Sequence, residues 1–357
     1  MSWSLTNISF RMAGVGNWQI LLPDDEMRRL YSQIYPDGVL LQDIEERFRS
    51  TVALWQKADI AATTGARLFP LGPVMMDDDI EIVTPWFDEI SKCICGTIRR
   101  YLRDYRLLAR RLSGGPGATK DRIGNIVTIL ICAEGLDIST FSRLRYELIG
   151  RHPQRAPAGR FFFWGYAFSE GPKRIFGVTT YGRGEAVRLS VIRSRGLDRG
   201  QMPALLRDDA TLNFIQGLCL KEPGIFTENG IEGMIHDLRD VGLLEPDGPP
   251  RLAIPIFSDR DIEEASRIHN QVATEITSDF TARMTRLENL ISRCSFARCS
   301  LPDVLCMLFH LAYSYAADEL VRTGTIPDFP AQAGGEWGVW IRLVGTQPLT
   351  SNSYDDD

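Results

Sequence analysis

Few side chains in this sequence have the types and spacing that metal binding or acid–base catalysis requires. Its four histidines include no H-E-x-x-H pair or similar metal-binding spacing. His310 lies between Phe309 and Leu311 in an apolar stretch, which favours a core or interface role. The histidines are His152, His236, His269 and His310.

Four cysteines and one acidic run are candidate metal ligands. Cys93 and Cys95 precede a distant pair, Cys294 and Cys299. On a helix, a one-residue gap points the first two thiols to different faces, so packing is their favoured role. The acidic run 77–79 has oxygen donors for a divalent cation, but consecutive acids in a loop are usually solvated. No metal or cofactor is therefore expected.

A glycine-rich segment, residues 113–117, is followed by Thr119 and Lys120. A phosphate-binding loop needs glycine directly before the lysine and serine or threonine directly after it. Thr119 and Asp121 occupy those positions, so the segment is predicted to be a linker. The sequence contains neither a G-x-S-x-G nucleophile elbow nor a G-x-G-x-x-G dinucleotide fingerprint. An enzyme is therefore the third of three functional hypotheses.

Composition describes a globular chain without obvious export signals. The 357 residues are 44% hydrophobic and 24% charged, values typical of folded proteins. Seven cysteines, an odd number in a long chain, favour a reducing compartment. The first residues lack a secretory pattern, and no apolar run reaches the roughly 20 residues of a membrane span. We expect a cytoplasmic protein that does not bind membranes.

Charge is distributed unevenly along the chain. Residues 97–199 carry 20 basic and 8 acidic side chains, a net charge of +12, whereas the whole chain has −6. A basic middle between acidic flanks is consistent with binding a polyanion. The favoured interpretation is that it packs against the acidic ends of the same chain or of a partner subunit.

Periodicity predicts an α+β fold, mostly helical, with long C-terminal helices. Thr84-Pro85 has the pattern of a cap and first residue for a helix that ends near Leu112. Residues 160–168, 174–181 and 186–192 are strand-like and separated by turns, which predicts a three-stranded antiparallel meander. The predicted divisions are an N-terminal helical domain (1–113), a basic helix and meander (121–199), a module (203–258), a helical hairpin with closing strand (259–346) and a flexible acidic tail (347–357).

The clearest local pattern lies at 203–258. A helix to Leu220, a turn and a second helix from Thr227 are followed by Val241-Gly242-Leu243-Leu244, a turn, and a strand that starts near Arg251. This order resembles the winged-helix fold of bacterial regulators, at the level of the superfamily. The resemblance implies that Thr227, Asn229 and Arg239 lie on or beside the recognition helix, with Arg251 on the wing. Residues 121–199, a helix followed by strands, are a possible second module of this kind.

The second helix of the module departs from that pattern because it is acidic. It carries Glu228, Glu232, Asp237 and Asp240 against only Arg239. DNA-reading helices need cations to neutralise phosphates, so a DNA surface is also sought in the basic middle. The candidate nucleic-acid-binding residues are Arg143, Arg145, Arg151, Arg155, Arg160, Lys173, Arg174, Arg239 and Arg251.

Two functional hypotheses precede the enzyme. The first is a dimeric winged-helix transcriptional regulator that binds duplex DNA. The second is an interaction or scaffold protein that uses the winged-helix fold without binding DNA. A long apolar stripe from Ile262 to Ile291 predicts a homodimer through residues 259–322, unless the helix from Thr84 to Leu112 covers the stripe within one chain.

Overall fold

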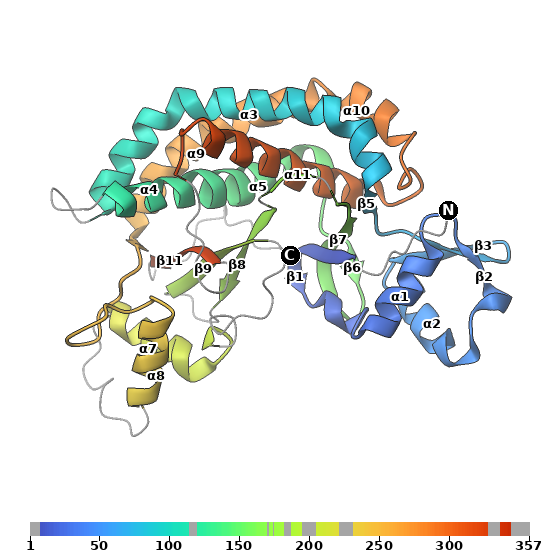
Figure 1. Cartoon of the computed structure of the whole chain (residues 1–357), viewed down its shortest axis with the longest axis horizontal. Helices are drawn as coiled ribbons and strands as arrows, with labels where there is room; N and C mark the ends of the chain where they lie inside the picture. Colours follow the sequence, from blue (N-terminus) through green and yellow to red (C-terminus); the bar gives the residue numbers. More distant parts are fainter. Residues whose placement is uncertain are drawn as a thin grey trace. The chain divides into compact units, whose positions relative to one another are not determined.

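The chain folds into two compact units, each made of non-contiguous segments (Figure 1). The structure is a computed structural model that describes residues 8–113, 120–169, 171–173, 175–181, 187–194, 205–220, 231–327 and 336–343. It is an α+β protein, which confirms the predicted class. Unit 1 contains Met1–Lys92, Arg143–Lys173 and Thr277–Tyr315; unit 2 contains Cys93–Ser142, Arg174–Ile276 and Ala316–Asp357. The predicted 121–199 domain is thus divided between the units, whereas the 203–258 module lies within unit 2.

The aromatic segment predicted as a strand forms β7 (Gly159–Ala167) at the centre of the unit 1 sheet. It pairs antiparallel with β1 (Ser9–Gly16) and parallel with β5 (Val74–Met76), and β6 (Gln154–Arg155) pairs with its start. The consecutive side chains Phe161, Phe162 and Phe163 are all fully buried. Both faces of the strand are therefore covered, which explains its continuous aromatic run.

The remaining N-terminal part of unit 1 packs around these aromatics. It contains α1 (Asp25–Ile34), α2 (Arg49–Lys57) and a small sheet of β2 (Val39–Leu40), β4 (Arg67–Pro70) and β3 (Ala61–Thr64). The Asp24 side chain caps α1 by accepting from the Met27 amide at 2.8 Å. Tyr31 then places its buried ring edge-on to Trp55, with centroids 5.4 Å apart.

The long helix α3 (Asp77–Leu112) begins eight residues before Pro85, the predicted first residue. The prediction that Thr84 caps it and Pro85 opens it is wrong, because Pro85 lies inside the helix. The acids at 77–79 occupy the first turn, where they complement the positive end of the helix dipole. The Asp79 carboxylate also accepts from the Met76 amide at 3.1 Å. A run predicted to be solvated loop is therefore the N-terminus of α3.

Residues 120–149 form one continuous helical stretch. It consists of α4 (Lys120–Thr128), a π-helical segment (Ile129–Thr140), α5 (Phe141–Leu144) and a second π-helical segment (Arg145–Ile149). Nearly all of the first π-helical segment is buried. π-helical turns are rare and often lie at functional sites, so this segment is a candidate for a functional role.

The predicted three-stranded meander does not form. β8 (Phe176–Tyr181) and β9 (Val187–Ser194) pair as an antiparallel hairpin, as predicted. The first of the three predicted strands, residues 160–168, forms β7 and belongs to the unit 1 sheet instead. β9 pairs on its other side with β11 (Glu336–Leu343), which pairs in parallel with β10 (Ile256–Phe257). A distant C-terminal strand thus takes the place that a neighbouring strand was expected to fill.

The C-terminal part of the chain is helical, as predicted, but the helical segment that carries the apolar stripe from Ile262 to Ile291 is interrupted. It divides into α9 (Asp259–Thr281) and α10 (Met284–Ile291), and α11 (Leu301–Arg322) follows. Val272, Ile276, Phe280 and Leu287 are fully or almost fully buried within the single chain. The stripe that motivated a homodimer is therefore covered by its own chain and does not require a second subunit.

The α3 helix supplies part of that cover. Within unit 2, Glu275 of α9 accepts hydrogen bonds from Tyr101 at 2.8 Å and from Arg100 of α3. Within unit 1, Trp86 of α3 lies edge-on to Phe280 of α9, with ring centroids 5.0 Å apart. These contacts support the alternative in which α3 covers the stripe within one chain.

Two helical stretches meet a length and composition criterion for a membrane span: Lys120–Ile149 and Leu301–Arg322. In their most apolar windows, 67% and 78% of the residues are buried inside the protein. Core helices pass the same criterion, so these stretches are weak evidence for membrane insertion. Their burial is explained by their place in the cores of the two units.

Candidate functional site

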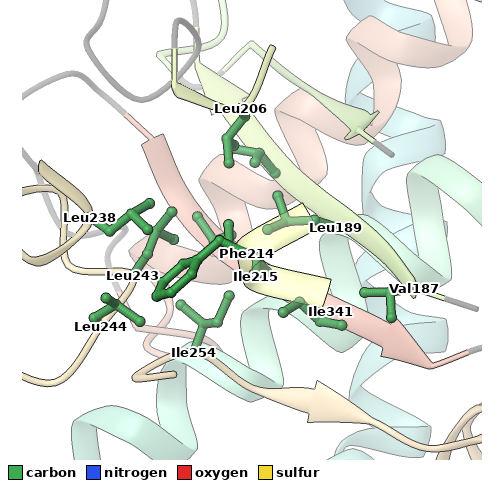
Figure 2. Packing of buried hydrophobic residues seen from close by; sticks show 12 residues of the cluster. Val187, Leu189, Leu206, Phe214, Ile215, Leu238, Leu243, Leu244, Ile254 and Ile341 are labelled. Carbon is green, nitrogen blue, oxygen red and sulfur yellow. The ribbon is translucent and has the colours of Figure 1, made fainter. Parts of the chain in front are cut away.

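The module at 203–258 has a hydrophobic core that joins its helices to the unit 2 sheet (Figure 2). Phe214 and Ile215 of α7 (Asp209–Leu220) and Leu238 of α8 (Ile231–Asp240) share one cluster of buried side chains. Leu189 of β9 and Ile341 of β11 belong to the same cluster. The two helices therefore rest on a sheet that includes the C-terminal strand.

The end of α8 has the backbone geometry expected from the sequence. Gly242 has φ +75°, a left-handed conformation that glycine adopts without steric cost. The Leu243 amide then donates to the Leu238 carbonyl at 2.9 Å, which closes the helix. Both leucines are fully buried, and Leu244 forms an antiparallel bridge with Leu252. A short hairpin thus follows α8 at the place predicted for the wing.

Arg239, the only cation of α8, is used to hold this hairpin. Its Nε donates to the Glu245 carbonyl at 3.1 Å, and its Nη2 donates to the Gly248 carbonyl at 2.5 Å. Those hydrogen bonds fix the turn in which Gly248 has φ +78°. Arg239 therefore has a structural role, whereas Arg251 is exposed on the far side of the turn. Thr227, Asn229 and Glu228 lie outside the described residues.

The exposed face of α8 is acidic. Glu232, His236 and Asp240 recur every four residues, and all three are exposed. His236 Nδ1 lies 3.5 Å from Asp240 Oδ1, so the carboxylate faces the imidazole rather than an arginine or lysine. Asp237 is half-buried at the side of this face. A phosphate backbone approaching α8 would meet carboxylates without a free cation.

The candidate residues of the basic middle do not share one environment. Arg143 forms a 2.7 Å ion pair with Glu147 one turn later. Arg160 donates to the Gln154 side chain at 3.0 Å and is exposed. Arg145 is half-buried, while Arg151 and Lys173 are exposed. These residues belong to unit 1, Arg239 and Arg251 belong to unit 2, and Arg174 lies outside the described residues.

Arg155 cannot reach a phosphate, so its assignment as a nucleic-acid contact is wrong. Its side chain is 1% exposed and forms an ion pair with Asp303, which is 0% exposed. The guanidinium also donates to the carbonyls of Ala58, Asp59 and Phe161. These contacts tie three separated segments of unit 1 together.

Asp303 is held from both sides in the first turn of α11. Its second carboxylate oxygen accepts from the Phe163 amide of β7 at 2.9 Å. Burial raises the pKa of Asp303, and the Arg155 guanidinium and the Phe163 amide oppose that shift. The pair therefore links β7 to α11 as part of the unit 1 core.

A second buried polar cluster lies at the π-helical segment in unit 2. Glu134, 4% exposed, accepts from the Trp340 indole at 2.6 Å and from Arg342 Nε at 2.8 Å. The Asp137 carboxylate accepts from the Val178 amide of β8 at 2.8 Å. The carboxylates of this segment therefore fasten the helical stretch to the unit 2 sheet.

His269 of α9 also contacts the π-helical segment. Its Nε2 lies 3.0 Å from the Leu130 carbonyl, so the neutral ring donates a hydrogen bond there. Burial lowers the pKa of His269 to about 4, and the contact with Leu130 only partly opposes this. His269 is consequently neutral at pH 7, which suits a structural contact better than proton transfer near neutrality.

The pH dependence of stability provides a test of this histidine. Because the folded-state pKa lies below the unfolded value near 6.5, the folded form binds the proton less well than the unfolded form. Stability is then complete above about pH 6.5 and decreases as pH falls toward 4. Between pH 7.5 and pH 5 we expect a loss of about 2 kcal/mol from His269 alone. His269→Gln should remove that component in paired urea titrations; equal pH dependence in both proteins would contradict it.

The remaining histidine, cysteine and acidic side chains that could bind a metal or catalyse a reaction have structural roles. Within the described residues, no group of three or more His, Cys, Asp and Glu side chains is arranged to hold a metal ion. All seven cysteines are free thiols. His310 is 7% exposed, with Nδ1 2.7 Å from the Cys306 carbonyl, which agrees with its predicted core role. Asp77 accepts from the Ser169 amide at 2.8 Å.

One group of cations was not among the candidates from the sequence. The C-terminal half of α3 presents exposed Arg103, Arg106 and Arg110 on one side of the helix. Their spacing of three and four residues was visible in a segment already predicted to be helical. What could not be read from the sequence is which of the neighbouring arginines have acidic partners.

Comparisons with known proteins yield no relative for this chain. No protein-family model matches it, and neither the curated proteins nor the solved structures contain a match. The function must therefore be argued from the surfaces described above.

Proposed function

We propose that the chain is a protein-interaction protein whose winged-helix-like module binds a basic partner protein through α8 and does not read DNA with that helix. The observation that carries this proposal is the charge on the exposed face of α8. Glu232 and Asp240 are exposed there, and Arg239 is bonded to the hairpin carbonyls. Direct readout of DNA requires cations and hydrogen-bond donors at this position.

The packing of the module supports a rigid docking surface. The Leu238 side chain of α8 is buried in the core of the module, so the helix cannot rotate to present its apolar side without disrupting that core. The acidic face is therefore the one that a partner meets. Charge complementarity would select a partner with exposed lysines or arginines and accelerate the encounter.

A photo-crosslinking amino acid at position 232 tests this function in cells that express the full chain. We expect one discrete protein adduct, because a specific partner presents a defined surface to α8. The same substitution at Glu263, an exposed acid on α9 that pairs with Arg267 at 3.0 Å, is the matched control. The adduct should be absent from the control.

Charge reversal separates a specific complex from incidental capture. Asp240→Lys should abolish the adduct at position 232, since it places a cation one turn from His236 and opposes a basic partner. An adduct of equal yield after charge reversal would contradict electrostatic docking. A nuclease-sensitive adduct at position 232 would overturn the proposal and restore α8 as a DNA-contacting helix.

A further inference from the structure

The C-terminal half of α3 carries an unusual density of arginines within unit 2. Six occur between residues 99 and 111, against one carboxylate, Asp104. Arg103, Arg106 and Arg110 are exposed and follow one another at three and four residues, so they lie on one side of the helix. Asp104 points about 100° around the helix from Arg103. We call these three arginines the α3 row.

The other arginines of this segment have acidic partners on neighbouring helices. Arg100 forms an ion pair with Glu275, and Arg111 lies 2.6 Å from Glu264. Arg99 lies 3.8 Å from Glu319 and donates to Thr323 at 3.1 Å. The chain therefore neutralises the arginines that face its own helices.

The described residues provide no such neutralisation for the α3 row. No carboxylate within the described part of the chain forms an ion pair with Arg103, Arg106 or Arg110. Favourable interaction with the helix dipole is confined to the last turn, so it accounts for Arg110 and not for Arg103 or Arg106. Like charges at these spacings slightly destabilise a helix. An anionic ligand offers a physical reason for retaining all three.

The surroundings of the α3 row favour nucleic acid over a membrane surface as its anionic ligand. A helix that anchors a protein in a bilayer surface inserts its apolar face. In α3 that face is occupied, because Ile98, Tyr105 and Leu108 are buried in the protein. Leu107, 54% exposed, is an isolated apolar side chain beside the row. The apolar face of α3 is therefore not available for insertion, whereas an extended phosphate backbone can contact the exposed guanidinium groups directly.

We propose that Arg103, Arg106 and Arg110 bind the phosphate backbone of duplex DNA. The α-carbons of Arg103 and Arg110 are about 10 Å apart along the helix axis, whereas phosphates of one strand rise about 3.4 Å per nucleotide. Each guanidinium can thus contact a different phosphate and bind it through two parallel N–H donors. Such contacts hold the duplex without reading its sequence. This inference is independent of the proposed role of α8.

The test compares full-length wild type with Arg103→Gln/Arg106→Gln/Arg110→Gln in fluorescence anisotropy on a labelled 30-base-pair DNA. At about 50 mM salt the triple variant should bind roughly 100-fold more weakly. Its plot of log affinity against log salt should be shallower by about two to three. The matched control, Arg47→Gln/Arg49→Gln/Arg267→Gln, removes three exposed arginines that pair with nearby carboxylates. It should bind like wild type.

Several outcomes would overturn the inference. These are absence of wild-type binding to DNA at low salt, equal loss in the triple variant and the control, or binding to phosphatidylserine vesicles in preference to DNA. Binding to duplex RNA alone would reassign the row to a different nucleic acid and also contradicts the proposal. Circular dichroism should show that the triple variant folds. If it does not, Arg106→Gln alone must reduce the salt dependence by about one.

The two proposals have distinguishable failures. The protein can form the α8 adduct without binding DNA, which contradicts only the proposal for the α3 row. It can bind DNA without forming the adduct, which contradicts only the proposal for α8. The DNA assay uses purified protein and a defined duplex, whereas the crosslinking assay reports on a cellular protein. Neither result substitutes for the other.

Discussion

Replacing Asp303 with alanine is expected to lower the free energy of unfolding by about 3–5 kcal/mol. The substitution leaves Arg155 charged and almost fully buried without its counter-ion. It also removes the acceptor for the Phe163 amide in β7. Urea unfolding followed by tryptophan fluorescence measures the change, because Trp55 and Trp164 lie in the unit 1 core.

Two further variants separate charge from packing at Asp303. Asp303→Asn keeps an acceptor for the Phe163 amide but removes the negative charge, so its destabilisation should fall between wild type and alanine. Glu263→Ala removes one partner of an exposed ion pair and should change stability by less than about 1 kcal/mol. Equal effects of Asp303→Ala and Glu263→Ala would show that the buried pair contributes nothing beyond a surface pair.

The Glu134→Ala substitution is expected to lower the free energy of unfolding by about 3 kcal/mol, because it removes contacts within unit 2. The substitution leaves the buried Trp340 indole N–H without its acceptor and removes the counter-ion of Arg342. Arg342 retains partial access to water, with 22% of its side chain exposed, so the loss should be smaller than at Asp303. Urea unfolding monitored by circular dichroism measures it.

Conservative replacement identifies the source of the Glu134 effect. Glu134→Gln retains a carbonyl oxygen for Trp340 and loses only the charge, so it should recover part of the stability. Arg342→Met tests the same pair from the other side and leaves the indole hydrogen bond intact. If the free energy of unfolding of Glu134→Ala is within about 0.5 kcal/mol of the wild-type value, the cluster does not anchor the π-helical segment to β11.

The helix α8, its C-terminus and the β8–β9 hairpin could be predicted from the sequence, because each is determined by residues close together in the chain. Helical spacing predicts that Leu238 is buried, and it is. The end of a helix favours a left-handed glycine, which is Gly242 here, followed by the buried Leu243. The β8–β9 hairpin likewise needs only two alternating segments and a turn. These features depend on residues within a few turns of one another, so one chain segment contains the necessary information.

Pairing between distant segments was decided only in the tertiary structure. β7 is the clearest case: its aromatic run predicts a strand but does not specify the partner. It pairs with β1, some 150 residues earlier in the chain, and with β5, instead of with β8. The helix start at Asp77 and the covered face of α9 were also settled by contacts with remote residues.

The functional candidates show the same division. Net charge and the position of each arginine are properties of the sequence, so the basic middle and the acidic α8 were evident at once. Whether an arginine is available to a ligand depends on its neighbours in space. Arg155 is buried against Asp303 and Arg239 holds a turn, whereas Arg103 and Arg106 remain exposed without carboxylate partners in the described chain. Charge was thus determined by the sequence, and its availability was determined by burial and ion pairing in the fold.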